Sequence, residues 1–210
     1  MSVIPGWFGY KCKLDNQVAT AMQVQGVENA FNKLFQLHKF NQVLEIGTAS
    51  GGTTLIVRDA MNEHGMRDSI IRTYDTNTSD KNLQSYISKG EKIEFLNDNL
   101  FDSSGTKIKS DSAEPKNFIQ RPGKTLVLCD GGGKRFELPS ISPFLKSGDI
   151  IMAHDYAKDS EYFRANIENK IWNWHEISDA HISHSMQKYN LFKIMEQDFD
   201  SVVWVCLQKK

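Results

Sequence analysis

The segment from Thr125 to Cys129 constrains the fold more than any other part of the chain. It is a short run of apolar residues, it is bounded by turns on both sides, and Asp130 follows it directly. A strand that is apolar on both of its faces is typical of a parallel sheet that is covered by helices on both sides. The segment therefore predicts an α/β protein built around such a sheet.

Strand-like and helix-like segments alternate along the rest of the chain. We expect further strands over residues 42–46, 70–74, 92–96, 149–153 and 201–207. We expect helices from residue 27 onward, over 53–64, from about residue 80 through 87, over 134–145 and over 160–174. This order predicts a Rossmann-like, doubly wound and mostly parallel sheet, with a C-terminal antiparallel strand and an N-terminal helix.

The length of 210 residues corresponds to one compact domain. We divide it into an N-terminal arm and helix, residues 1–40, and a Rossmann-like domain, residues 41–210. Residues 102–124 are polar, with Pro115 and Pro122, and are interpreted as mostly loop, with a helix in this crossover as the alternative.

The composition of the chain indicates which kinds of binding partner and which cellular compartment to expect. The 25 basic residues are balanced by 26 acidic ones, with no long basic run, so we expect no nucleic-acid partner. The cysteines Cys12, Cys129 and Cys206 are widely spaced, which favours neither disulfides nor a zinc site and indicates the cytoplasm. No segment has the apolar length of a membrane span. A small-molecule partner is the expectation, and a homo-oligomer stays open.

Polar residues follow the predicted strands at the edge where such sheets bind ligands. Gly47, Gly51 and Gly52 allow a tight turn and a close approach of the backbone to a ligand. The carboxylate of Asp75 can accept hydrogen bonds from two ribose hydroxyls, and that of Asp98 from an adenine amino group. Tight packing of strand against helix is the alternative explanation for the glycines.

Together these residues resemble the motifs of class I S-adenosylmethionine-dependent methyltransferases. The similarity covers Glu45-x-Gly47-x-x-x-Gly51, Asp75 and Asp98, and it extends over about residues 42–156. It implies S-adenosylmethionine as the cofactor, with the methionine part near the turn, the ribose at Asp75 and the adenine at Asp98. The implied cofactor-binding residues are Glu45, Gly47, Thr48, Ala49, Ser50, Gly51, Asp75, Asp98 and Asn99.

Two further strand ends are similar to the metal site of catechol-type O-methyltransferases and of the family named after cephalosporin hydroxylase. Asp130 follows one strand and His154-Asp155 the next, so we expect Asp130, His154 and Asp155 to bind a divalent cation, Mg²⁺ or Mn²⁺. In that chemistry the metal binds and orients an acceptor hydroxyl. Lys134 resembles the general base of the catechol enzymes, one residue later, so Lys134 and Asp130 are the expected catalytic residues.

Departures from these families leave alternatives. Gly133 stands where relatives often have a histidine, and His154 where a carboxylate is commoner. If these residues bind no metal, Asp130 is expected to cap the next helix and His154-Asp155 to begin a surface loop. The function expected is methyl transfer to a hydroxyl of a small molecule or sugar. A nicotinamide-dependent oxidoreductase, a non-catalytic S-adenosylmethionine-binding protein and, from the family name, a hydroxylase are the alternatives.

Other residues have a structural and a functional interpretation. His181 and His184 have tolerable metal spacing but no visible helix around them, so we favour ordinary surface histidines. Trp172 and Trp174 would line a substrate pocket or pack in a core or subunit contact. The aromatic segment 7–10 would cover the cofactor or pack on a neighbour.

Overall fold

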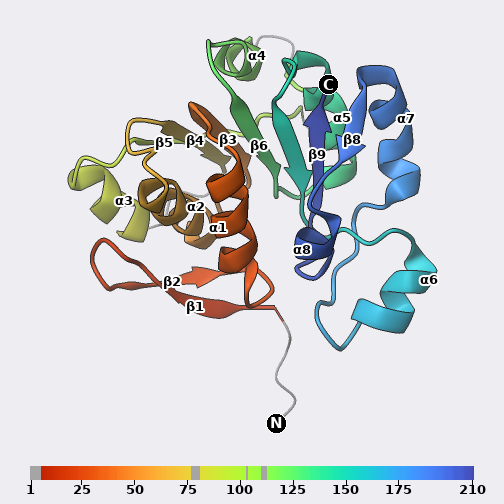
Figure 1. Cartoon of the computed structure of the whole chain (residues 1–210), viewed down its shortest axis with the longest axis horizontal. Coiled ribbons are helices and arrows are strands. Elements are labelled where there is room, and N and C mark those ends of the chain that lie inside the picture. The colour runs from red at the N-terminus through yellow and green to blue at the C-terminus, as the bar shows by residue number, and fades with distance from the viewer. Residues whose placement is uncertain (1–5, 77–80, 103, 110–112) are drawn as a thin grey trace.

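The computed structural model describes residues 6–76, 81–102, 104–109 and 113–210. Within these residues the chain forms a seven-stranded sheet, a separate two-stranded hairpin, and helices on both faces of the sheet (Figure 1). The strands of the sheet are β3 Gln42–Ile46, β4 Ile70–Asp75, β5 Ile93–Asn97, β6 Thr125–Cys129, β7 Ile150–Ala153, β8 Leu191–Lys193 and β9 Val205–Lys209.

The strand order is β5-β4-β3-β6-β7-β9-β8. Neighbouring strands from β5 to β7 are parallel, and β9 is antiparallel to both β7 and β8. The predicted Rossmann-like sheet with an antiparallel C-terminal strand is therefore confirmed. The chain builds outward from β3 to β5 and then returns to β6, so the strand order reverses between β3 and β6, which is where such folds bind ligands.

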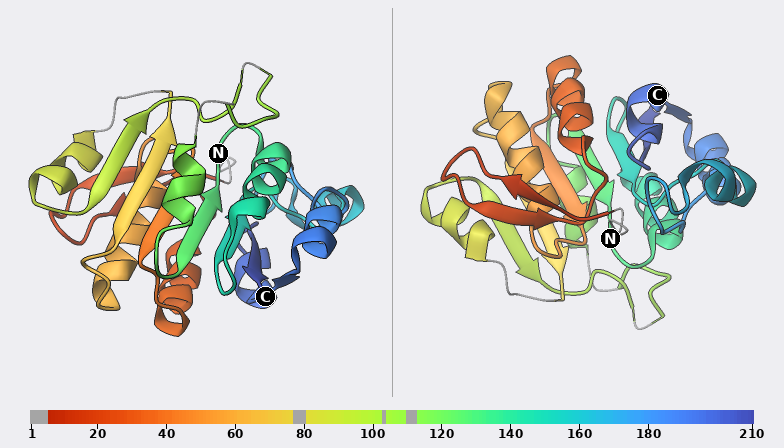
Figure 2. Two further views of the ribbon diagram at one scale, coloured as in Figure 1. Left: turned by 90° about the horizontal axis from the view of Figure 1, so that it is seen from above. Right: turned by 90° about the horizontal axis from the view of Figure 1, so that it is seen from below.

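Side chains of the central strand β6 alternate between two apolar cores. Leu126 and Leu128 pack under α1 Val27–Leu37, α2 Gly52–Glu63, α3 Lys81–Ser88 and α8 Glu196–Asp200. Val127 and Cys129 pack under α4 Glu114–Ile119, α5 Lys134–Ile141 and α7 Asp179–Tyr189. The views in Figure 2 show these two helix layers with the sheet between them. Burial on both faces, as predicted for β6, is confirmed.

The segment 160–174 departs from the single helix expected. A three-residue helix, α6 Ser160–Tyr162, continues as a π-helical turn, Phe163–Ile167, and the regular structure ends there. Asn169 then adopts a left-handed conformation, with φ of 58°. Phe163, Ile167 and Trp172 are all buried in one small cluster, and the five-residue step to Trp172 does not fit one face of a helix.

The stretch 102–124 contains a helix that the loop interpretation missed. Helix α4 spans Glu114–Ile119, and Pro115 lies in its first turn, where proline is tolerated. Phe118 and Ile119 are buried against the sheet, which gives this short helix its stability. The signal in the sequence was the adjacent apolar pair Phe118-Ile119 after Pro115.

The N-terminal aromatic segment belongs to a hairpin that the sequence analysis did not predict, formed by β1 Phe8–Lys11 and β2 Val18–Ala21. It lies across one end of the sheet, at the bottom of the view in Figure 1. Asp59 in α2 accepts hydrogen bonds from the hydroxyls of Tyr10 (2.8 Å) and Tyr86 (3.0 Å). This buried carboxylate fixes the hairpin to the helix layer of its own chain.

Further differences concern the C-terminal part. The last strand begins at Val205, because residues 201–203 form a turn in which Val203 has a φ of 57°. Helix α7 and strand β8 were not predicted, although Ser178 and His181 form a capping box at the start of α7. Residue 80, near which this helix was expected to begin, lies outside the described residues, and α3 begins at Lys81. Among the described residues, no helix has the length and apolarity needed to cross a bilayer.

Candidate active site

The turn between β3 and α2 lies against the end of β6. Gly47 has a φ of 93°, and a Cβ atom there would lie 2.3 Å from the carbonyl oxygen of Asp130. Gly51, with a φ of 75°, precedes the first residue of α2 and donates its N–H to the Thr48 carbonyl at 2.8 Å. Both positions require glycine, so the turn is shaped for close approach.

Asp75 ends β4 beside this turn. Its Oδ2 accepts the N–H of Ala49 at 2.7 Å, which ties the strand end to the glycine turn. Asp75 lines a cavity that is continuous with the end of β5 and with the loop after β6. Its lining includes Gly47, Asp75, Asp98, Asn99, Gly131 and Glu137. The structure thus brings together the residues expected at the ribose and the adenine.

Glu45 supports the turn from beneath and does not line either of the cavities described here. Its side chain is fully buried; one oxygen accepts the Thr54 hydroxyl at 2.5 Å, and the other has no partner. Burial raises the pKa of Glu45 to about 8. Glu45 therefore holds a supporting position under the turn, and its part in cofactor binding stays a prediction.

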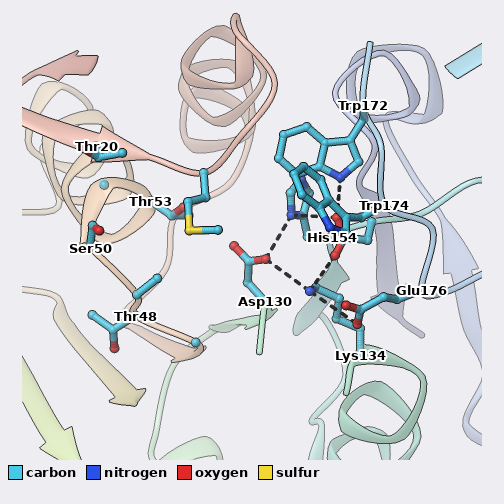
Figure 3. A pocket seen from close by; sticks show the side chains of 15 residues that line it. Thr20, Thr48, Ser50, Thr53, Asp130, Lys134, His154, Trp172, Trp174 and Glu176 are labelled. Atoms are coloured by element: carbon cyan, nitrogen blue, oxygen red, sulfur yellow. Dashed lines mark hydrogen bonds and ion pairs between the residues drawn. The ribbon is translucent and has the colours of Figure 1, made fainter. Parts of the chain in front are cut away.

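Gly47 also lines a second cavity, which Figure 3 shows from close by. The glycine turn forms one wall through Thr48, Ala49, Ser50 and Thr53, and β2 contributes Thr20. The opposite wall consists of Asp130, Lys134, His154, Asp155, Trp172, Trp174 and Glu176. The two tryptophans line this cavity, and Trp174 is exposed. Trp172 is buried and also packs in the core cluster with Phe163 and Ile167, so the pocket and core interpretations both stay open.

Lys134 is the centre of a charged group in this cavity. Its Nζ lies 2.7 Å from Asp155 Oδ2, 3.5 Å from Glu176 Oε2 and 3.9 Å from Asp130 Oδ1. Burial by itself would lower the pKa of Lys134, but the carboxylates of Asp130 and Asp155 outweigh burial and raise it. An amine held in its charged form is a hydrogen-bond donor, which argues against the general-base role expected for Lys134.

Asp155 is correspondingly held as a carboxylate. Burial opposes its ionisation, but His154 and Lys134, together with the hydrogen bond from Trp172, lower the pKa of Asp155. Trp172 donates its Nε1–H to Asp155 Oδ1 at 2.5 Å. Both oxygens of Asp155 therefore have a donor from the protein.

Asp130 and His154 form a second pair, 3.0 Å apart between Oδ1 and Nδ1. Gln23 donates to the other oxygen of Asp130 at 2.7 Å and accepts the indole N–H of Trp204 at 2.8 Å. The imidazole of His154 packs between Trp172 and Trp204, at 4.9 Å between ring centroids in each case, and its buried Nε2 has no partner. Gln23 and Glu176 were missed because neither belongs to a motif or to a predicted strand end.

The expected metal ligands are neighbours but do not form a metal-binding cluster. Over the described ranges, no group of three His, Cys, Asp or Glu side chains is arranged to hold a metal ion. The oxygens of Asp130 and Asp155 face N–H donors, and the ammonium group of Lys134 stands between the two carboxylates. This donor set does not fit a divalent cation, and the expected metal site is not present among the described residues.

The remaining histidines take no part in this site. His181 and His184 lie on α7, where a helix had not been expected, and Nδ1 of His181 accepts the N–H of Ser178 at 3.0 Å. His175 stacks on Phe163, with 4.9 Å between ring centroids. His181 thus takes part in capping its own helix.

Comparison with known proteins supports the fold. No protein-family model matches the chain, and no curated protein matches it significantly. Among solved structures, the chain is similar to CmcI in its apo form, with a TM-score of 0.62 and 13% identity over 96% of this chain and 76% of that one. It is also similar to a putative caffeoyl-CoA O-methyltransferase from Staphylococcus aureus, with a TM-score of 0.56 and 12% identity over 87% of this chain and 82% of that one.

A further similar structure is an O-methyltransferase family protein from Burkholderia thailandensis, with a TM-score of 0.55 and 13% identity over 89% of this chain. The chain spans 56% of the length of that protein. CmcI has also been solved with Mg and S-adenosylmethionine, and this form has a TM-score of 0.59 and 10% identity over 97% of this chain and 76% of that one. The chain therefore shares its Rossmann-like fold with these solved structures.

Proposed function

We propose that this chain is an S-adenosylmethionine-dependent methyltransferase that acts on a hydroxyl oxygen of a small molecule or sugar. One observation carries the proposal: two cavities meet at Gly47, one lined by Asp75 and the other by Asp130 and Lys134. An elongated cofactor needs such a pair of sites, one for its nucleoside and one for its reactive end. The strand-order reversal lies at the same place.

The cofactor-binding residues divide between the two cavities in this proposal. Asp75 accepts the ribose hydroxyls, because its carboxylate lines the first cavity and a carboxylate offers two acceptor oxygens. Asp98 and Asn99 face the adenine, and the turn from Gly47 to Gly51 passes along the methionine part. Gly47 lines both cavities, so a cofactor that passes along this turn can reach from one into the other.

The second cavity is proposed to hold the acceptor. When bound, S-adenosylmethionine supplies a methyl group on a positively charged sulfur, which is transferred by direct displacement. The chain contributes position and electrostatics: the negative side chains of Asp130, Asp155 and Glu176 lie on the wall opposite the glycine turn. Trp174 and Met22 offer an apolar surface to the body of the acceptor.

Calorimetric titration with S-adenosylhomocysteine tests this proposal. Asp75→Asn should weaken binding at least about tenfold, since a charge-assisted hydrogen bond contributes about 1.5–3 kcal/mol. Asp68→Asn is the matched control, because Asp68 lies just before the same strand and is fully exposed. Equal affinity of the Asp75 variant and the wild type would contradict the assignment of Asp75.

The same titration separates the other functions. Binding of NAD without binding of S-adenosylhomocysteine would indicate an oxidoreductase. Binding without any turnover of S-adenosylmethionine across acceptors would indicate a non-catalytic binding protein.

The three cysteines are free and buried, which supports the proposed reducing, cytoplasmic compartment.

A further inference from the structure

Three carboxylates converge on one ammonium group in the acceptor cavity (Figure 3). They come from three separate places in the chain: Asp130 follows β6, Asp155 follows β7, and Glu176 lies in the segment before α7. Lys134 itself is the first residue of α5, and its side chain is 7% exposed. Folding therefore assembles an anionic site and fills it with a cation from the same chain.

We propose that the ammonium group of Lys134 is the fixed cation of this site, and that it binds the acceptor oxygen without a divalent metal. The acceptor part of this inference rests on the proposed methyltransferase function. The occupation of the anionic site by Lys134 is independent of that function, so the two can fail separately.

The hydrogen bonds of the carboxylates favour a lysine over a metal. Asp130 faces Gln23 (2.7 Å) and His154 (3.0 Å), so both of its oxygens are directed at nitrogen donors. Asp155 faces Trp172 (2.5 Å) and Lys134 (2.7 Å) in the same way. A divalent cation needs several oxygens that point at one centre, and here the ammonium group of Lys134 already occupies the centre between the carboxylates of Asp130, Asp155 and Glu176.

His154 is also turned away from a ligand role. A carboxylate only accepts hydrogen bonds, so Nδ1 carries the proton that is shared with Asp130, and only Nε2 is left to bind a metal. Nε2 is buried in the stack with Trp172 and Trp204. The imidazole therefore positions Asp130 and has no exposed nitrogen for a cation in the cavity.

Lys134 retains the capacity to bind the acceptor. An ammonium group has three N–H donors, and Asp155 is its partner at a short distance, whereas Glu176 and Asp130 lie at 3.5 and 3.9 Å. A second donor is thus available to an acceptor oxygen, and the positive charge favours the deprotonated form of that oxygen.

These groups account for every bond and proton that changes in the methyl transfer. The carbon–sulfur bond of the sulfonium breaks and leaves its electron pair on sulfur, while a carbon–oxygen bond forms to the acceptor. The hydroxyl proton passes to the carboxylate of Glu176, which is 35% exposed and can release it to water. Lys134 remains an ammonium group throughout.

Titration of the metal-free full-length protein with Mn²⁺, followed by electron paramagnetic resonance, tests the inference without an acceptor. The wild type should bind no stoichiometric Mn²⁺. Lys134→Ala should bind one Mn²⁺ per chain, because three carboxylates lose their common cation. Its affinity should be at least about tenfold above that of any weak binding by the wild type. Lys193→Ala is the control: it removes a lysine that lies 2.8 Å from Asp179, outside the cavity, and should gain no site.

One stoichiometric Mn²⁺ in the wild type that is lost in Asp155→Asn would overturn the inference, and this arm requires no Lys134 variant to fold. A folded Lys134→Ala protein, verified by circular dichroism, that gains no Mn²⁺ would overturn it as well. Calorimetry with S-adenosylhomocysteine on the same samples tests the proposed function by itself. A wild type that binds neither ligand would refute that function while the assignment of Lys134 stands.

Discussion

Lys134 and Asp155 form an ion pair, with 2.7 Å between Nζ and Oδ2, and their side chains are only 7% and 6% exposed. Removal of one partner of a buried pair leaves an uncompensated charge and typically costs about 3–5 kcal/mol. We expect Asp155→Asn, which keeps an acceptor for Trp172, to lower the free energy of unfolding in urea by roughly 3 kcal/mol. Asp68→Asn, at the exposed pair with Lys92, should cause no measurable change. Equal stability of both variants and the wild type would show that the pair is solvated.

The glycine turn gives a second prediction. In Gly47→Ala the new Cβ would lie 2.3 Å from the Asp130 carbonyl, at a φ of 93°. We expect a loss of S-adenosylhomocysteine binding in calorimetry together with lower stability. Gly90→Ala has a similar φ, 86°, but nothing within 4 Å of the Cβ position, so it should cost about 1 kcal/mol and bind normally. Normal binding by Gly47→Ala would place the cofactor elsewhere.

The buried carboxyl group of Glu45 should make the free energy of unfolding depend on pH. Burial raises its pKa to about 8 in the folded protein, above its value in an unfolded chain. The folded state therefore holds the proton more tightly, and stability that is complete at low pH is lost as the pH rises from about 4.5 through about 8. Glu137, whose pKa burial raises to about 7, acts in the same direction.

Urea unfolding of the wild type and Glu45→Gln between pH 5 and pH 9 measures this effect. Glutamine does not ionise and can still accept the Thr54 hydroxyl, so the decrease in stability with pH should be smaller in the variant. Parallel pH curves for the two proteins would mean that Glu45 titrates as it does in water.

The hairpin gives a fourth prediction. Asp59 accepts the hydroxyls of Tyr10 and Tyr86 and the N–H of Lys13, at 2.8, 3.0 and 2.9 Å respectively. Asp59→Ala leaves these buried donors without a partner, at a cost of about 1–3 kcal/mol for each one that water cannot reach. We expect Asp59→Ala to lower the melting temperature markedly and to expose the hairpin to proteases. Unchanged protease resistance would contradict the anchoring role of Asp59.

Much of the fold could be predicted because its signals are local. The boundaries of β3 and β6 agree with the sequence analysis to the residue, since each strand is a short apolar run that turns interrupt. Helix α4 and the irregular segment 163–174 could not be predicted in this way. Their form depends on which side chains, such as Phe118 and Trp172, find burial against distant elements.

The candidate site shows the same limit. Strand ends correctly placed Asp75, Asp98, Asp130, His154 and Asp155 along one edge of the sheet. The partners of these side chains could not be derived from the sequence. Gln23, which donates to Asp130, is 107 residues away from it in the sequence, and Glu176 approaches Lys134 from a loop. The ammonium of Lys134 between the carboxylates is a property of side-chain direction, which spacing alone does not determine.

A crystal structure of the chain with S-adenosylhomocysteine tests the central claim most directly. The account predicts both ribose hydroxyls within hydrogen-bond distance of the Asp75 carboxylate, the adenine beside Asp98 and Asn99, and the sulfur past Gly47, facing the cavity of Asp130 and Lys134. A ligand bound away from Gly47, or a ribose without contact to Asp75, would contradict it.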